Sequence, residues 1–150
     1  MRRLARMADI MSPEARSERM SRIRGRDTLP EWVVRRYLHS IGFRYRLHRQ
    51  DLPGRPDIVL PCHGVAIFVN GCFWHAHTCQ RGRIPSTRAD FWREKLENNR
   101  RRDERNRRLL RKAGWRVITV WECSLSTKPR AGRRLQRLAS EILASPKKQR

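Results

Sequence analysis

The chain has 150 residues, of which 36 are Lys or Arg and 14 are Asp or Glu, so its net charge is +22. A cationic excess of this size, supplied almost entirely by arginine, favours nucleic acid over a membrane surface as the partner, although a merely solubilising surface is the alternative. No apolar run approaches the roughly 20 residues of a membrane-spanning helix, and none follows the basic start as in a signal peptide, so a membrane or secreted protein is not expected.

The first half of the chain predicts a basic arm, one helix and three short strands. Residues 1–27 are polar and Arg-rich and form the expected arm, which precedes a single domain over residues 28–145. A helix is expected at 30–41, because Pro30 suits the first helical position and Gly42 ends the pattern. Its apolar face comprises Trp32, Val33, Tyr37, Leu38 and Ile41. Strands are expected at residues 43–48, 57–60 and 65–69.

The second half predicts a long helix, a strand and a last helix. The long polar helix spans roughly residues 88–112, and its inward face is expected to comprise Phe91, Trp92, Leu96, Leu109 and Leu110. A core strand follows at residues 115–121. The last helix is marked by Leu135, Leu138, Ile142 and Leu143, and residues 146–150 form a basic tail. This order predicts an α/β fold with a small mixed sheet flanked by helices.

A cysteine- and histidine-rich segment follows the third predicted strand. We expect Cys72, His77, Cys79 and the distant Cys123 to bind one structural zinc ion, since thiolates and imidazoles at close spacing are zinc ligands. His75 lies in the same segment, and the spacing alone leaves it open as a ligand. The fourth cysteine, Cys62, is expected to pack as a small hydrophobic side chain. Without a secretion signal, metal binding is favoured over disulfides.

Several motifs in this chain resemble those of the very-short-patch-repair (Vsr) endonucleases, over about residues 12–125. The matching segments are Leu52–Asp57, Gly71–His75, Phe91–Lys95, Asn99 with Arg102–Asp103, Gly114–Val117 and Val120–Cys123. The resemblance implies a restriction-endonuclease-like core of the PD-(D/E)xK type. It also implies nicking of one DNA strand beside the T of a T:G mismatch, which arises when 5-methylcytosine deaminates.

The same resemblance implies partners and a location. A Vsr-like enzyme would act on double-stranded DNA, work alongside a cytosine-5 DNA methyltransferase and mismatch-repair proteins, and be a monomer in the bacterial cytoplasm at the nucleoid. Two other functions are weighed against it. A non-catalytic zinc DNA-binding module would have no use for an oxygen-ligand metal site beside the zinc. A nuclease with another target would not need the full set of motifs.

Asp57 is the candidate ligand for a catalytic magnesium ion. Phosphodiester hydrolysis by this kind of nuclease needs a divalent cation, and a hard ion prefers oxygen ligands. Asp57 is the sole acid in the strands at 57–60 and 65–69, although it could instead be a surface residue at a strand edge. By resemblance, the backbone carbonyl of Val69 would be a second ligand.

His75 is the candidate general base. Related nucleases place an acid and a lysine two residues apart on the next strand, where this chain has Phe68 and Asn70, so another base is needed. An imidazole can take a proton from water near neutral pH. Several relatives have Thr-His where this chain has Val69-Asn70, so no acid–base role is expected at Asn70. Glu31 resembles an acid that orients water, but it could equally be a carboxylate at a helix start.

Apolar and polar side chains form a candidate DNA-binding set. Phe73 and Trp74 are expected to insert between bases, together with Met20 from the arm, which the resemblance adds. The alternative is that both aromatic residues pack under the loop. Lys95 and Asn99 are expected DNA contacts, because they share one face of the long helix with Trp92, itself either core or contact.

Overall fold

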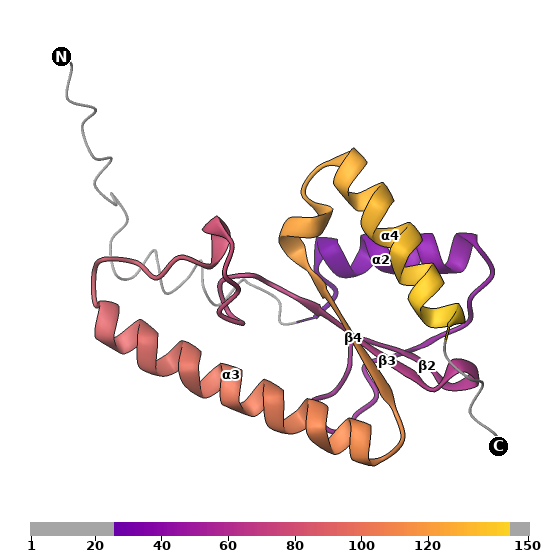
Figure 1. Ribbon diagram of the computed structural model, residues 1–150, viewed down its shortest axis with the longest axis horizontal. Coiled ribbons are helices and arrows are strands. Elements are labelled where there is room, and N and C mark those ends of the chain that lie inside the picture. Colours follow the sequence, from indigo (N-terminus) through magenta and orange to yellow (C-terminus); the bar gives the residue numbers. More distant parts are fainter. Residues whose placement is uncertain (1–25, 145–150) are drawn as a thin grey trace.

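The computed structural model describes residues 26–144 (Figure 1). Nearly all of the expected basic arm, including Met20, and the expected tail at 146–150 lie outside the described residues. The described part is an α/β fold, as the sequence predicts, with four strands, three α-helices and three short 3-10 segments. No helix within residues 26–144 is both long and apolar enough to cross a membrane.

A single mixed sheet with strand order β1-β2-β3-β4 forms the centre of the fold. Its strands are β1 (Arg46–Leu47), β2 (Ile58–Leu60), β3 (Val65–Asn70) and β4 (Arg116–Trp121). β1 pairs with β2 and β2 with β3 in the antiparallel sense, whereas β3 pairs with β4 in the parallel sense. A parallel pair requires a long crossover, and the segment containing the longest helix supplies it.

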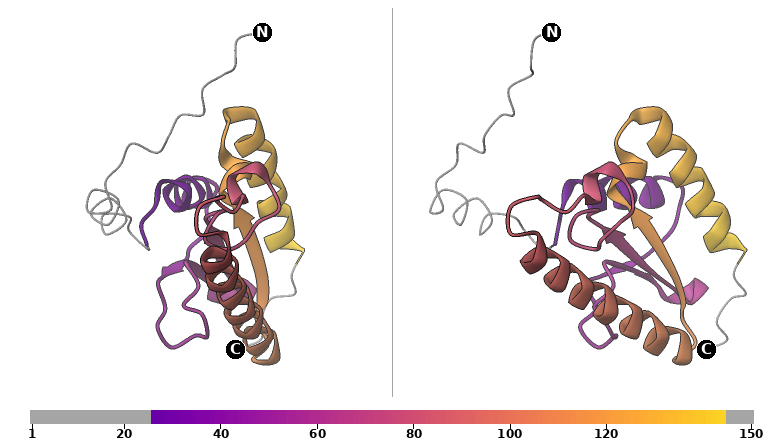
Figure 2. Two further views of the ribbon diagram at one scale, coloured as in Figure 1. Left: turned by 90° about the vertical axis from the view of Figure 1, so that its left-hand side faces the viewer. Right: turned by 60° about the vertical axis from the view of Figure 1, so that its left-hand side comes forward.

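Helices cover both faces of the sheet (Figures 1 and 2). α2 (Leu29–Ser40) and α4 (Lys128–Leu143) pack on one face, over a core that includes Ile58, Ile67 and Val120. α3 (Ala89–Lys112) lies on the other face, over a smaller core of Val59, Ala66, Leu110 and Trp115. The sheet has a core on each face because the side chains of successive residues in a strand point to opposite faces.

The helices bury only some of the residues that the sequence predicts, among them Leu38, Leu110 and Leu138. Trp32, Ile41, Phe91, Leu109 and Leu143 were predicted to face the core, but all of them are exposed. In α2, Glu31 and Arg35 are buried as an ion pair and occupy space that the apolar pattern assigned to Trp32 and Ile41. In α3 the buried residues are Leu96 and Leu110, of which Leu110 belongs to the small core.

Two further expectations are corrected. Cys62 is exposed rather than buried, because the 3-10 segment Pro61–His63 turns outward between β2 and β3. The strand expected at 43–48 is reduced to the two residues of β1, since Phe43 is drawn into the core beside the end of α2 and His48 has a left-handed backbone.

Candidate active site and metal-binding loop

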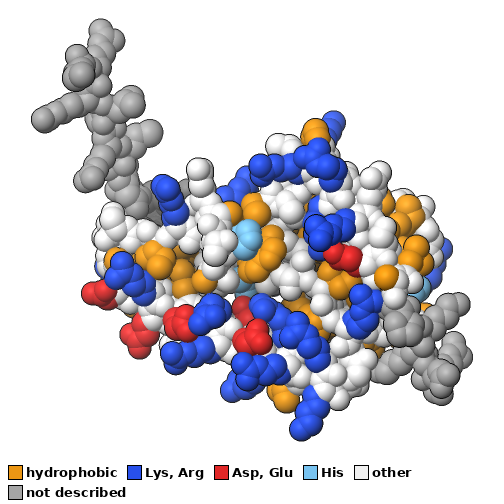
Figure 3. Space-filling model, in the orientation of Figure 1, with side chains coloured by type: hydrophobic (Ala, Val, Ile, Leu, Met, Phe, Trp, Pro, Cys, Tyr) orange, Lys and Arg blue, Asp and Glu red, His pale blue; other side chains and the backbone are white. Residues whose placement is uncertain are grey.

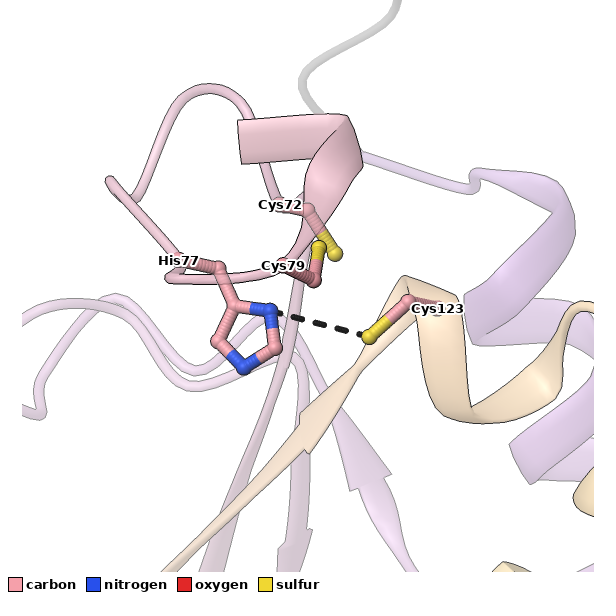
Figure 4. Close-up of side chains that lie close together, drawn as sticks. All are labelled: Cys72, His77, Cys79 and Cys123. Atoms are coloured by element: carbon pink, nitrogen blue, oxygen red, sulfur yellow. Dashed lines mark hydrogen bonds between the residues drawn. The ribbon is translucent and has the colours of Figure 1, made fainter. Parts of the chain in front are cut away.

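The strand pairing brings three distant segments to one end of the sheet. Antiparallel pairing of β2 with β3 places Asp57, just before β2, beside the last residues of β3. Parallel pairing of β3 with β4 sets Asn70 opposite Trp121, so the loop after β3 lies beside Cys123 (Figure 4). The topology therefore gathers Asp57, the loop at 71–79 and Cys123 within a short distance.

Four side chains at this end could hold a metal ion. The candidate ligand atoms of Cys72, His77, Cys79 and Cys123 all lie within 4.8 Å of one another (Figure 4). The Nδ1 atom of His77 is 3.6 Å from the sulfur of Cys123, and the His77 ring stacks on Trp121 with 4.2 Å between centroids. Three sulfurs and one imidazole nitrogen are a donor set that suits tetrahedral zinc. His75, the alternative ligand, is outside this cluster.

The loop backbone holds the ligands in place. The His77 amide donates to the Cys72 carbonyl at 2.9 Å, and Gly82 donates to the Cys79 carbonyl at 3.0 Å. A Cβ atom at Gly82 would lie 1.9 Å from the His77 carbonyl oxygen, so glycine is required there. Burial raises the pKa of the Cys72 thiol to about 12, a penalty on its thiolate that a bound cation would remove.

A cleft of about 1350 Å³ lies next to the loop at 71–79, which we call the metal loop. Its charged lining residues include the cations Arg26, Arg55, Lys95, Arg102 and Arg107 and the acids Glu31, Asp57, Asp103 and Glu122. Lys and Arg side chains are also frequent over the face drawn in Figure 3, where few acids are visible. A cleft with acids among cations can attract a phosphate backbone and still place carboxylates beside it.

Asp57 is a half-buried carboxylate in this cleft. Its Oδ2 atom accepts a hydrogen bond from the Val69 amide at 2.7 Å, which fixes the side chain against the end of β3. Burial raises its pKa from the ordinary 3.8 to about 6; the Val69 bond works in the opposite direction, and the nearby Glu31 raises the pKa further. Burial and the second acid both disfavour the charged form of Asp57. A bound cation would stabilise that charge, so the position is favourable for one.

His75 is paired with Asp103. This acid belongs to one of the sequence motifs, but the motif gives it no role. The Nδ1 atom of His75 lies 2.5 Å from Oδ2 of Asp103, which projects from the middle of α3. A carboxylate at Nδ1 keeps the ring proton on that nitrogen and leaves Nε2 as an acceptor. The pair lines the same cleft as Asp57, so a carboxylate and a proton acceptor face one space.

Glu31 stabilises the start of α2 and also lines the cleft. Its carboxylate accepts from the Thr28 hydroxyl, the Asp27 amide and the Arg35 guanidinium, so it stabilises the start of α2. It also lines the cleft near Asp57. Arg35 pairs with both Asp27 and Glu31, and His48 adjoins this group. The Arg35 guanidinium therefore already supplies the positive charge between these carboxylates.

Aromatic residues from the loop and from α3 form one cluster. Phe73 meets Trp74 and Trp92 edge to face, with centroids 5.1 and 5.2 Å away. The Lys95 ammonium lies 5.7 Å from the centroids of both tryptophan rings, and Asn99 donates to the Trp74 carbonyl at 3.1 Å. Lys95 and Asn99 are thus next to Phe73 and Trp74, whose rings are neither fully buried nor fully exposed.

The chain is similar in sequence to known DNA endonucleases. The family model for DNA mismatch endonuclease Vsr matches residues 8–81. The chain is 52% identical over 120 residues to the type II nicking enzyme V.XorIIP of Xanthomonas oryzae, covering 80% of this chain and 88% of that protein. It is 44% identical to the type II nicking enzyme V.NmeAIP of Neisseria meningitidis, covering 91% and 97% of the two chains. It is also 43% identical to the DNA mismatch endonuclease Vsr of Escherichia coli, covering 79% and 76%. The chain therefore belongs to the Vsr family of DNA mismatch endonucleases.

Proposed function

We propose that this enzyme nicks one strand of double-stranded DNA beside the T of a T:G mismatch, in a reaction that depends on magnesium. Family membership makes the chain a nicking DNA endonuclease, which is a hydrolase. The mismatch, the metal and the residue roles are our proposal. The observation that carries it is the cleft, which Asp57 and the His75–Asp103 pair share with Trp74 of the aromatic cluster.

Asp57 and the Val69 carbonyl would hold the magnesium ion. The donor set fits a hard cation, because both groups offer oxygen and the raised pKa of Asp57 reflects a charge that lacks compensation. When bound, the ion would offset negative charge on the phosphate that is cut. Asp57, just before β2, is the feature that supports a PD-(D/E)xK-type core, with the usual lysine position taken by Asn70.

His75 would accept the proton of the attacking water at Nε2. Asp103 orients the ring through Nδ1 and stabilises the imidazolium that forms, as a carboxylate does for histidine in other hydrolases. Glu31, fixed by Thr28 and Arg35, would orient water on the other side of Asp57.

Two residues of the metal loop and two of α3 would also contact DNA. Phe73 and Trp74 would enter the base stack at the mismatch, and Lys95 and Asn99 would contact the DNA beside them. Met20 would join them from outside the described residues. The zinc ion that we propose for Cys72, His77, Cys79 and Cys123 would fix the loop carrying both Trp74 and His75.

The proposed function is tested with duplexes that differ at one base pair. Nicking of a T:G duplex is expected to exceed nicking of matched T:A and C:G duplexes by at least about tenfold, because a wobble pair is easier to unstack. Omitting magnesium should abolish nicking without releasing DNA. Equal nicking of all three duplexes would contradict the mismatch specificity, and full activity without any divalent cation would contradict the metal requirement.

A Phe73→Ala/Trp74→Ala double variant tests the contact with the base stack. Stacking of aromatic side chains on bases contributes about 1–3 kcal/mol per base, so affinity for the T:G duplex should fall about tenfold or more at fixed salt. Affinity for a matched duplex, which depends on charge, should change much less. Trp32→Ala, which removes an exposed tryptophan on α2, is the control. If the double variant stays folded and keeps the wild-type ratio of the two affinities, the rings pack under the loop instead.

A further inference from the structure

One cation in the cleft has features that the proposed roles leave unexplained. Arg55 lines the cleft two residues before Asp57 and is exposed. Among residues 26–144, its guanidinium has no hydrogen-bond or salt-bridge partner. Arg102 and Arg107, on the α3 side, differ because they bond to Asn99 and Glu104. Arg55 therefore lines the cleft as a cation that pairs with none of the acids among residues 26–144.

The backbone below Arg55 is fixed by a tight turn. The Arg55 amide donates to the Leu52 carbonyl at 3.1 Å, and Pro53 and Gly54 occupy the two central positions, with φ of 74° at Gly54. Proline followed by a residue with positive φ is the pattern of a type II turn. Leu52 packs against the core under α3, so the turn is anchored to the body of the domain.

The turn also lies directly against α3. A Cβ atom at Gly54 would be 2.9 Å from Cβ of Asn106, and 3.2 Å from the ring of Phe68, so no larger residue fits between the turn and the helix. Asn106 and Phe68 line the same cleft. The position of Arg55 is thus set by close packing on two elements.

Arg55 itself has an unusual backbone conformation. Its φ is 50°, in the left-handed region that a residue with a side chain rarely adopts, and it directly precedes Pro56. Such conformations persist when surrounding structure imposes them, and they cluster at functional sites. A glycine or asparagine would adopt this backbone more easily. The presence of arginine at such a position is accounted for if its guanidinium has a function in the cleft.

We propose that Arg55 binds a phosphate group of the DNA strand that enters the cleft, and that the Leu52–Arg55 turn holds the side chain ready for it. This inference rests on the proposed function of the cleft. A guanidinium offers two parallel N–H donors to phosphate oxygens, which fixes a phosphate in orientation as well as in place. The phosphate is held two residues from Asp57, so its contact with Arg55 aligns the strand with the carboxylate.

The salt dependence of DNA binding provides the test. Each phosphate contact contributes about 0.9 to the slope of log affinity against log salt concentration. Arg55→Asn keeps a residue that tolerates positive φ and removes the charge, so the slope should fall by about that amount and single-turnover nicking by about tenfold or more. Arg55→Lys should restore the slope but only part of the rate, since a lysine cannot make the two-pronged contact.

Arg49→Asn is the matched control. Arg49 lies in the same segment but is paired with Asp51 and does not line the cleft, so its loss should leave slope and rate close to those of the wild type. An unchanged slope in folded Arg55→Asn, or an equal fall in Arg49→Asn, would overturn the inference.

If Arg55→Asn does not fold, Arg55→Gly, which suits positive φ best, takes its place. A wild type that fails to nick the T:G duplex would contradict the proposed function alone, because the binding slopes still decide the role of Arg55.

Discussion

Replacing Asp57 with Asn is expected to lower the single-turnover rate of nicking about a thousandfold while mismatch binding is largely retained. A cation at the reacting phosphate contributes several kcal/mol of charge stabilisation, and each 1.4 kcal/mol or so corresponds to a factor of ten in rate. The substituted amide would keep the shape of the side chain and an oxygen that can accept from the Val69 amide, so the loss would come from the charge. The rate is measured with enzyme in excess over a T:G duplex.

The same variant carries a second signature in stability. The folded protein raises the pKa of Asp57 from 3.8 to about 6, so this group destabilises the fold progressively as pH rises through that interval and fully above it. Asparagine has no charge to bury, so in magnesium-free buffer at pH 8 the variant should melt several degrees above the wild type. Asp51→Asn, an exposed acid paired with Arg49, is the control for both measurements. Wild-type nicking by the Asp57→Asn enzyme would remove Asp57 from the catalytic site.

Replacing Cys123 with Ser is expected to abolish stable zinc binding and to lower the melting temperature by about 10 °C or more. A structural zinc site contributes about 10–16 kcal/mol of binding free energy in small domains, and the remaining three side chains cannot close the tetrahedron. Cys123 follows β4, whereas the other three candidate ligands follow β3, so its loss also separates the loop from the sheet. Nicking should fall as well, since His75 lies within the same loop.

Cys62→Ser provides a control with the same chemical change. Cys62 is exposed in the segment between β2 and β3 and lies outside the cluster, so its replacement should change neither metal content nor melting temperature. Metal content is measured on purified protein by elemental analysis and melting by circular dichroism. Full zinc occupancy and an unchanged melting curve in Cys123→Ser would exclude Cys123 from the site.

The sequence predicted the elements of the fold better than the residues that they bury. α2 and α3 begin and end within one residue of the expected helices, because Pro30, Gly42 and Gly114 are strong local signals. The burial of Glu31 and Arg35 could not be read from an apolar pattern, because their burial depends on an ion pair formed within the fold.

The sequence likewise predicted one part of the candidate site, the metal-ligand group, but not the His75–Asp103 pair. Cys72, His77 and Cys79 are close in sequence, and the expected grouping with Cys123 is present in the structure because β3 and β4 are parallel neighbours. The pairing of His75 with Asp103 was not predicted. These residues are 28 positions apart, and although Asp103 belongs to one of the matching motifs, that motif does not indicate which side chain it would contact.

The crossover between β3 and β4 has a consequence for the synthesis of this protein. Asp57 and His75 emerge early from the ribosome, but Asp103 comes later on α3, and the fourth candidate ligand at Cys123 follows the last strand. A chain interrupted before residue 123 would lack the fourth candidate ligand, and one interrupted before residue 103 would also lack the acid that pairs with His75. On the proposed function, the groups that would cut DNA can come together only after residue 123 has been made.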